Sequence, residues 1–282
     1  MRHLLPFQLT ALLATLWGGA AQAQPTLTGT APRANSHNVA PTAPITVSFS
    51  QALSGNSITA LRVFSTQRGG MRSGQSGTTI VGGNQLSFIP PTSWKPGETV
   101  RTTVTTDARN TAGQALAKGH VFDFTAATGG NGLGTLTNVG GSSFSMGAYP
   151  NALRLADVDG DGDLDVLSSN SNYYGGTPLS VRLNNGAGQF SGGSEIPVAS
   201  DAQGSRSLTV GDIDNDGDLD VLATDNVYKV SVCLNNGSGV YTVANIMELG
   251  TTKLTDLELA DIDADGDLDC LMYGAALTSS GC

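Results

Sequence analysis

The sequence predicts an all-β protein, a β-sandwich followed by an incomplete β-propeller of about two and a half four-stranded blades. Two observations predict this order. Residues 24–128 consist of short alternating apolar segments separated by Pro, Gly and Asn, with no helical period, which is typical of antiparallel sandwiches. Residues 135–282 repeat one strand-rich unit at a period of about 50 residues, as propeller blades do.

The first 23 residues are predicted to be a signal peptide that is not part of the fold. They combine a basic start, an apolar stretch to about Trp17 and a small-residue cleavage site at Ala21-Gln22-Ala23. A membrane anchor is the alternative, but the apolar stretch is short for a bilayer span of roughly 20 residues. We therefore expect a secreted protein, extracellular or at the cell surface, with no membrane span after cleavage before Gln24.

The three cysteines, Cys233, Cys270 and Cys282, are too few for a domain built on disulfides. Cys233 and Cys270 lie in strand-like apolar runs and are predicted to be small buried hydrophobic residues. A Cys233–Cys270 bridge is the alternative.

Charge is divided unevenly along the chain. Residues 24–128 carry eight basic and three acidic residues, a net +5, whereas residues 129–282 carry five basic and twenty-one acidic residues, a net −16. Fifteen of those acids lie in three repeated loops. This balance argues against nucleic acid as a partner, because phosphate contacts need clusters of Lys and Arg, and it favours cations.

The strands predicted between residues 24 and 128 are 45–50, 61–65, 77–83, 85–90, 99–106 and 120–126. The stretches "PTAPITVSFSQAL", "LSFIPPTSWKPGETVRTTV" and "RNTAGQALAKGHVFDFTA" together resemble the bacterial Ig-like domain of surface-layer and secreted proteins. This resemblance implies an Ig-like β-sandwich that acts as a spacer or as a modest adhesive module.

Residues 129–134 are predicted to be a flexible linker, since they lie in the uncharged, Gly-rich stretch "TAATGGNGLG". No G-x-G-x-x-G follows a strand here, so nucleotide binding is not predicted. The chain thus divides into a signal peptide (1–23), an Ig-like sandwich (24–128), the linker (129–134) and the repeats (135–282).

Three acidic loops occur in register within the repeats: "ADVDGDGDLD" at 156–165, "GDIDNDGDLD" at 211–220 and "ADIDADGDLD" at 260–269. Their first aspartates are 55 and 49 residues apart. "LSVRLNNGAGQF" follows the first loop and "VSVCLNNGSGVY" the second, so one unit is predicted as four strands, A to D, with the loop between A and B. In the first unit these strands are predicted at 151–158, 163–170, 179–185 and 189–198. The third copy has strands A and B only, and residues 135–147 could supply an outer strand of a preceding blade.

Every loop follows the template D-x-D-x-D-G-D-L-D. Aspartates at positions 1, 3 and 5 can converge on one hard cation, glycine at position 6 permits a sharp turn, and positions 7 and 9 can offer a carbonyl and a further carboxylate. EF-hand loops are the alternative, but they need Glu at position 12 and flanking helices. Position 12 is Ser168, Ala223 or Met272, so neither EF-hands nor the related dockerin loops are predicted.

The loops, the blade period and the "LNNG" motif resemble the FG-GAP/VCBS repeats of integrin-α-like propellers over roughly residues 132–282. The resemblance implies about three structural Ca²⁺ ions, one in each A–B loop. The carboxylate ligands it implies are Asp157, Asp159, Asp161, Asp165, Asp212, Asp214, Asp216, Asp220, Asp261, Asp263, Asp265 and Asp269. The carbonyl ligands it implies are those of Asp163, Asp218 and Asp267. Magnesium, which prefers fewer carboxylates and more water, and an acidic turn without a ligand are the alternatives.

The number of repeats is small for a propeller, which typically closes with four to eight blades. We therefore expect a truncated reading frame or a fragment of a longer propeller protein. Closure of one propeller by several chains is the second expectation.

No catalytic constellation is recognisable in the sequence. The predicted mature chain has two histidines, His37 and His120, both in the sandwich, and no G-x-S-x-G or H-E-x-x-H motif. We expect a non-catalytic module for adhesion, scaffolding or ligand binding, whose partner is an extracellular protein or a carbohydrate. The alternative is the binding part of a secreted carbohydrate-active enzyme, because some propellers of the resembled family act on carbohydrates.

Overall fold

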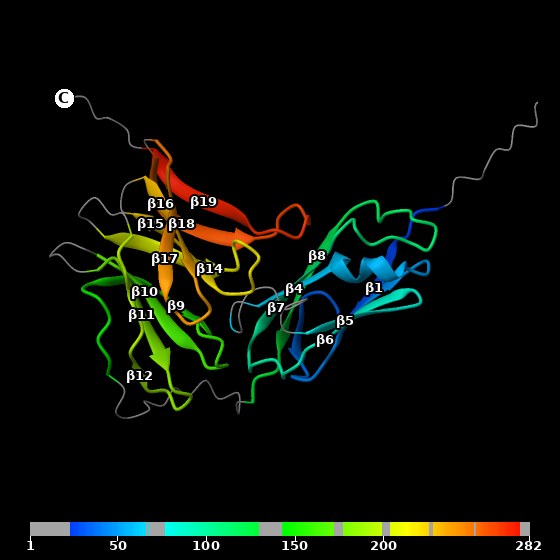
Figure 1. Ribbon diagram of the computed structural model, residues 1–282, viewed down its shortest axis with the longest axis horizontal. Helices are drawn as coiled ribbons and strands as arrows, with labels where there is room; N and C mark the ends of the chain where they lie inside the picture. Colours follow the sequence, from blue (N-terminus) through cyan, green and yellow to red (C-terminus); the bar gives the residue numbers. More distant parts are fainter. Residues whose placement is uncertain are drawn as a thin grey trace, which may run out of the picture.

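The computed structural model describes residues 23–65, 67, 77–129, 143–171, 177–198, 204–225, 228–250 and 252–276. Nearly all of the predicted signal peptide and linker, as well as Cys282, lie outside the described residues. The described residues form almost only strands and turns, with one short 3-10 helix, η1 (Gly55–Ala60). Figure 1 shows a sandwich of the early strands beside a fan of the later strands.

The N-terminal sandwich consists of two four-stranded sheets, in the orders β1-β3-β6-β5 and β2-β8-β7-β4. Neighbouring strands are antiparallel, except that β2 runs parallel to β8. All six predicted strands are present, whereas the sequence pattern does not predict the partly exposed β1 and β2. The strands are β1 (Leu27–Ala31), β2 (Ser36–Val39), β3 (Ile45–Phe49), β4 (Leu61–Ser65), β5 (Thr78–Gly82), β6 (Gln85–Ile89), β7 (Thr99–Val104) and β8 (His120–Ala126).

Aromatic rings fill the space between the two sheets of the sandwich. Phe88 of β6 and Phe124 of β8 pack on Trp94, with ring centroids 6.2 and 5.7 Å away, and all three side chains are buried. The indole Nε1 of Trp94 donates to the carbonyl oxygen of Ala43 at 2.9 Å. The polar atom of the largest core side chain is therefore satisfied, as burial of a tryptophan requires.

The repeat region consists of three antiparallel sheets, in the orders β9-β10-β11-β12, β14-β15-β16-β17 and β18-β19. Their first strands, β9, β14 and β18, lie side by side, and the sheets fan out from them (Figure 1). The strands are β9 (Pro150–Ala156), β10 (Asp165–Asn170), β11 (Leu179–Asn184), β12 (Phe190–Ser191), β13 (Glu195–Ile196), β14 (Ser205–Gly211), β15 (Asp220–Asp225), β16 (Lys229–Asn235), β17 (Tyr241–Glu248), β18 (Thr252–Ala260) and β19 (Asp269–Ala276).

The outer strand of the first sheet differs from the prediction. One strand D is predicted over residues 189–198, but the structure has two short strands, β12 and β13, which both pair with β11. Gly192 and Gly193 interrupt them with positive φ angles of 65° and 79°, and a β-carbon at Gly193 would lie 2.2 Å from the carbonyl oxygen of Val181. The glycine pair therefore breaks the strand where the chain must pass close to β11.

Apolar layers between successive sheets hold the fan together. One cluster joins the first two sheets and includes Leu167, Leu208 and Val221, and a second joins the last two sheets and includes Leu222 and Leu257. No sheet closes into a ring among the described residues, and the third sheet has two strands there. An all-β chain with a sandwich and an incomplete propeller is thus confirmed. Of the outer strand predicted at 135–147, only residues 143–147 are described, and they form no strand.

Cys233 and Cys270, the two cysteines within the described residues, are free thiols, as predicted. Cys233 is fully buried in the core between the first two sheets, whereas Cys270 is partly buried. Burial raises the pKa of the Cys233 thiol to about 12. Among the described residues, no helix has the length and apolar character that crossing a membrane requires.

Phe124→Ala should lower the free energy of unfolding of the sandwich by about 3–5 kcal/mol, because truncating a buried phenylalanine leaves a cavity. Val121→Ala, on the same strand but 40% exposed, should cost about 1 kcal/mol or less. Urea denaturation followed by the fluorescence of Trp94, the only tryptophan after the predicted signal peptide, measures both. Equal losses in the two variants would contradict this core.

Candidate metal centre

Each acidic loop connects the first two strands of one sheet. The first lies between β9 and β10, the second between β14 and β15, and the third between β18 and β19. Position 9 of every loop, Asp165, Asp220 or Asp269, is the first residue of the following strand. The antiparallel pairing therefore fixes both ends of each loop, and the intervening residues must curl between them.

The carboxylates of each loop converge on one another. In the first two loops the convergent groups are positions 1, 3 and 9, which are Asp157, Asp159 and Asp165 and then Asp212, Asp214 and Asp220. In the third loop they are positions 1, 3 and 5, which are Asp261, Asp263 and Asp265. Within each group, one oxygen from every carboxylate lies within 4.8 Å of the others. The three clusters could therefore each hold a metal ion.

The other predicted ligands lie outside these three groups. Asp161 and Asp216, at position 5, and Asp269, at position 9 of the third loop, are not members. At position 7, where a carbonyl ligand is predicted, the side chains point to other partners. Asp163 Oδ1 lies 3.6 Å from Lys95 Nζ, and Asp267 Oδ1 accepts a hydrogen bond from Asn215 Nδ2 at 3.2 Å.

The alternating aspartates hold the curl of the loop through backbone hydrogen bonds. The position-3 carboxylate accepts the N–H of position 5 at 3.2, 3.3 and 3.2 Å in the three loops. The position-5 carboxylate accepts the N–H of position 7 at 2.8, 2.9 and 2.9 Å. The glycine at position 6 has φ of 94°, 99° and 99°, which side-chain-bearing residues rarely adopt. The template thus specifies the shape of the loop as well as its charge.

The position-9 aspartate is held on both sides. In the first loop, Asp165 accepts the N–H of Val158 at 2.9 Å and the N–H of Asn184, on β11, at 2.8 Å. In the second loop, Asp220 accepts the corresponding bonds from Ile213 and Asn235, both at 2.9 Å. Sequence reasoning assigned no role to these asparagines, although the shared "LNN" of the repeats was the signal that could have identified them.

Asn235 also connects neighbouring loops. Its Nδ2 donates to the carbonyl oxygens of Val158, in the first loop, and of Leu219, in the second, at 2.8 and 3.1 Å. One buried side chain therefore contacts two successive acidic loops, so their positions depend on each other.

Comparison with protein families identifies both regions. Residues 21–126 match the bacterial Ig-like domain, and residues 157–223 and 216–272 match the FG-GAP-like repeat. The chain joins a bacterial Ig-like domain to FG-GAP-like repeats. Both families are typically non-catalytic, which agrees with the absence of a recognisable catalytic motif in the sequence. The comparison with curated proteins gave no match.

Three of the similar solved structures show a distant likeness. CopC from Methylosinus trichosporium OB3b is 13% identical, with 38% of this chain and 97% of that chain covered and a TM-score of 0.26. The N-terminal part of the bacterial S-layer protein SbsC is 12% identical, with 81% and 44% covered and a TM-score of 0.28. The L,D-transpeptidase 1 of Mycobacterium tuberculosis is 14% identical, with 78% and 82% covered and a TM-score of 0.26. This chain spans less than half of that SbsC structure, and TM-scores this low carry no weight for function.

Burial disfavours the ionised form of several aspartates in the FG-GAP loops. Asp157 is 4% exposed, and its Oδ1 has no hydrogen-bond partner. Burial, together with the negative charges of Asp161 and Asp165, raises the pKa of its carboxyl to about 6. Burial likewise raises the pKa of Asp165 and of Asp220 to about 6. Among the described residues, no ion pair involves these carboxylates, and a cation among them would supply the missing positive charge.

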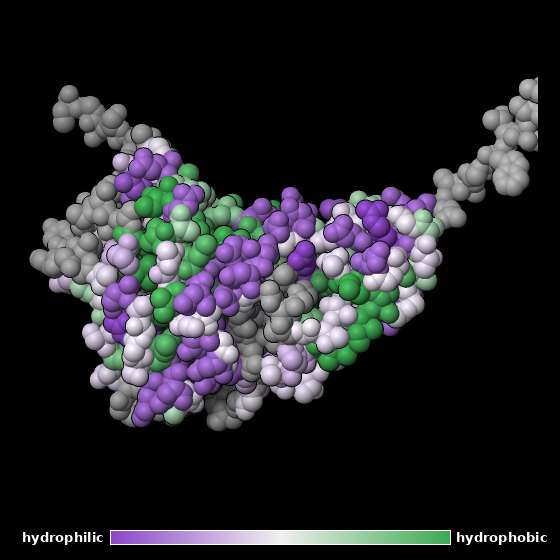
Figure 2. All heavy atoms as spheres, in the orientation of Figure 1, coloured by the Kyte–Doolittle hydropathy of each residue, from purple (hydrophilic) through white to green (hydrophobic). Residues whose placement is uncertain are grey.

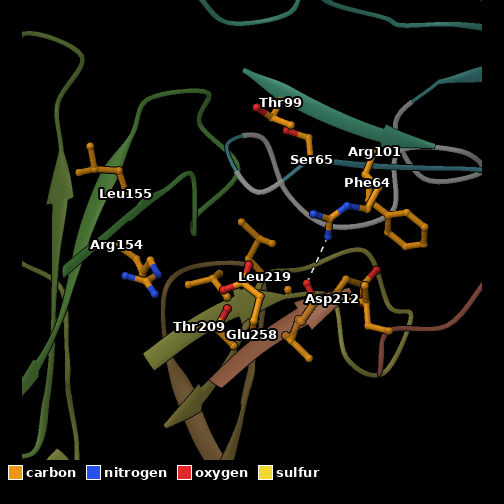
Figure 3. A pocket seen from close by; sticks show the side chains of 14 residues that line it. Phe64, Ser65, Thr99, Arg101, Arg154, Leu155, Thr209, Asp212, Leu219 and Glu258 are labelled. Carbon is orange, nitrogen blue, oxygen red and sulfur yellow. Dashed lines mark hydrogen bonds between the residues drawn. The ribbon is translucent and has the colours of Figure 1, made fainter. Parts of the chain in front are cut away.

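Two hollows lie along the first strands of the repeats. A polar one of about 470 Å³ is lined by β9, β14 and β18 and includes Arg154, Arg206 and Asp256. A smaller cavity of about 240 Å³ separates the repeats from the Ig-like domain and includes Phe64 and Arg101. Figure 3 shows Arg101 reaching from the Ig-like domain across this cavity. Figure 2 shows hydrophilic side chains over much of the surface in view, with hydrophobic patches on both regions.

Asn235→Ala should destabilise the FG-GAP repeats by about 1–3 kcal/mol, since it removes two hydrogen bonds to buried carbonyl oxygens. Each oxygen keeps one donor, the N–H of Gly239 for Val158 and the hydroxyl of Tyr241 for Leu219. Asn236→Ala is the matched control, because Asn236 is exposed and its side chain accepts one local N–H, that of Ser238. Thermal unfolding by calorimetry measures the difference. Similar melting temperatures for the two variants would contradict the bridging role of Asn235.

The stability of the chelated protein should fall as the pH rises. The pKa values of Asp157, Asp165 and Asp220 are raised to about 6 in the folded protein, against about 3.9 in an unfolded chain. The folded state therefore binds more protons, so its added stability is complete below about pH 4 and is lost as the pH rises through about 6. Calorimetric scans in chelator between about pH 5 and 7.5 test this. A melting temperature of the repeats that holds or rises over that range would contradict it.

Proposed function

We propose that the three FG-GAP loops bind calcium and that the ions are structural. The observation that carries the proposal is the buried Oδ1 of Asp157, which has no hydrogen-bond partner and belongs to a group of convergent carboxylates. An ionised oxygen buried without a partner is costly. A cation in the loop would remove that cost, and the same template recurs in the other two loops.

Calcium suits this donor set better than magnesium does. Calcium takes six to eight oxygen ligands in a flexible geometry, whereas magnesium usually keeps several waters and binds one or two carboxylates. Each loop offers three convergent carboxylates. The remaining carboxylates at positions 5 and 9, and the carbonyl oxygens of Asp163, Asp218 and Asp267, complete the proposed shell.

A structural role follows from where the loops lie. Each one joins two strands of a sheet, and its ligands lie within nine residues. An ion there would fix the hairpin and relieve the repulsion between its carboxylates. The bound ion would therefore stabilise the stacked repeats.

At the level of the whole chain, we propose a secreted, non-catalytic module for adhesion, scaffolding or ligand binding. An Ig-like domain joined to FG-GAP repeats supports a binding or spacing role, although a fold alone never assigns a ligand. The partner would be an extracellular protein or a carbohydrate. The polar hollow of about 470 Å³ lined by Arg154, Arg206 and Asp256 offers charged groups of both signs to such a ligand.

Calorimetric titration of the mature chain with CaCl₂ should give about three equivalents, one for each loop. Asp157→Asn should reduce this to about two, because it removes a buried ligand of the first loop alone. Asp163→Asn is the control, since it retains the backbone carbonyl that is the proposed ligand at position 7. No heat with calcium, or equal binding of magnesium, would overturn the proposal. Loss of a site in the control would contradict the proposed ligand set.

A further inference from the structure

The third acidic loop lies against the Ig-like domain. Thr103 on β7 donates a hydrogen bond from Oγ1 to Oδ2 of Asp261 at 2.6 Å, and both residues are buried. Two residues earlier on the same strand, Arg101 Nη1 donates to the carbonyl oxygen of Leu259 at 3.2 Å (Figure 3). The first carboxylate of this loop is therefore shared with another domain.

The two backbones approach closely around this hydrogen bond. A β-carbon at Gly119, just before β8, would lie 2.4 Å from the carbonyl oxygen of Ala264. A β-carbon at Gly266 would lie 3.1 Å from Cγ2 of Thr105. Only glycine permits contact this close at Gly119, so the loop fits the surface of the Ig-like domain tightly.

Among the described residues, the third loop has no counterpart of one support that the other two loops have. Asp165 and Asp220 are each held by the N–H of an asparagine on the third strand of their sheet. In the described residues the third sheet has two strands, and Asp269 accepts a hydrogen bond from the N–H of Ile262 at 2.8 Å. The convergent carboxylates also differ, because position 5 replaces position 9. The Ig-like domain supports this loop from its other end, at Asp261.

We propose that the third loop and the Ig-like domain form one composite calcium site, in which Thr103 positions Asp261 and the bound ion holds the two domains together. The proposal rests on calcium binding by the FG-GAP loops. A hydrogen bond from a neighbouring residue orients a metal-ligating carboxylate, and its loss typically costs about 10–100-fold in metal affinity. Because coupling is reciprocal, an ion that prefers the docked loop also stabilises docking by the same factor.

The coupling has a direct physical cause. Without a cation, the carboxylates of Asp261, Asp263 and Asp265 repel one another, which favours a wider loop. A wider loop moves Asp261 away from Thr103 and presses Ala264 against Gly119. The first two loops have no such hydrogen bond to the Ig-like domain among the described contacts, so the coupling belongs to the third loop.

The first experiment measures calcium affinity in the mature full chain. Thr103→Val should weaken one of the three sites by about tenfold and leave two unchanged. Thr103→Ser should restore the affinity, since it retains the hydroxyl. Thr102→Val is the matched control, because the neighbouring Thr102 is equally buried but its Oγ1 has no hydrogen-bond partner. If Thr103→Val acted only by destabilising the fold, Thr103→Ser would not restore calcium affinity at that one site.

The second experiment measures shape by small-angle X-ray scattering. Calcium-loaded wild type should be compact, and chelator should increase its maximum dimension. Asp263→Asn, in the third loop, should remain extended in calcium, whereas Asp214→Asn, at the same position of the second loop, should become compact. Gly119→Val should be extended in either condition, because its side chain meets Ala264, whereas Gly29→Ala, with open space around it, should behave as wild type.

The outcomes separate the two proposals. The composite site alone would be overturned by either of two results. One is that Thr103→Val binds three calcium equivalents with unaltered affinity, and the other is that the scattering profile of the wild type is the same with calcium and with chelator. The absence of calcium binding by the wild type would overturn the calcium proposal and the composite site with it. Equal behaviour of the Asp263→Asn and Asp214→Asn variants would show that docking does not depend on the third loop.

Discussion

Repulsion among like charges is the constraint on which the repeats depend. Each loop places five aspartates within nine residues, and the ends of each loop are fixed by strand pairing, so the carboxylates cannot separate freely. Backbone N–H groups satisfy part of this charge, since the alternating aspartates accept hydrogen bonds from their own loop. They do not satisfy the buried Oδ1 of Asp157. The remaining charge makes the loop a candidate cation site, and it opposes the folded loop while no cation is bound.

The same constraint explains why the repeats depend on one another. The position-9 aspartate is fixed by an asparagine from the third strand of its sheet, and Asn235 extends that link to the preceding loop through the carbonyl oxygen of Val158. Apolar layers join the same sheets from their faces. A change in the conformation of one loop should therefore alter the stability of the next, as expected for stacked repeats whose stability comes from neighbouring units. The third sheet, with two described strands, has the Ig-like domain as its neighbour at Asp261 instead.

The sequence patterns predicted those features of the fold that are decided by residues close together in the sequence. The alternation in "ITVSFS" and the repeated loop template identify β3 and the three hairpins, because side-chain period and glycine placement are decided within a few residues. The division of strand D into β12 and β13 follows from the close passage of Gly193 over Val181, which is a tertiary contact. The roles of Asn184, Asn235 and Thr103 also arise from contacts between distant segments, Thr103 and Asp261 being 158 residues apart. A single sequence carries no signal for such a pair, whereas the repeated "LNN" carried one for the asparagines.

Two electrostatic effects act on the contact between the domains, and they oppose each other. The Ig-like region (24–128) carries a net +5 and residues 129–282 a net −16, so neutralising the loops with cations weakens their general attraction. That attraction is screened beyond about 8–10 Å at physiological salt. Among the described residues, the ion pair between the two regions joins Lys95 and Asp163, whose side chains are partly exposed, and such pairs contribute about 0–1 kcal/mol. The buried hydrogen bond from Thr103 to Asp261 is charge-assisted and shielded from water. It forms only when the third loop has the conformation that places Asp261 beside Thr103. The local effect therefore outweighs the general one, and a cation that removes negative charge should still tighten the junction.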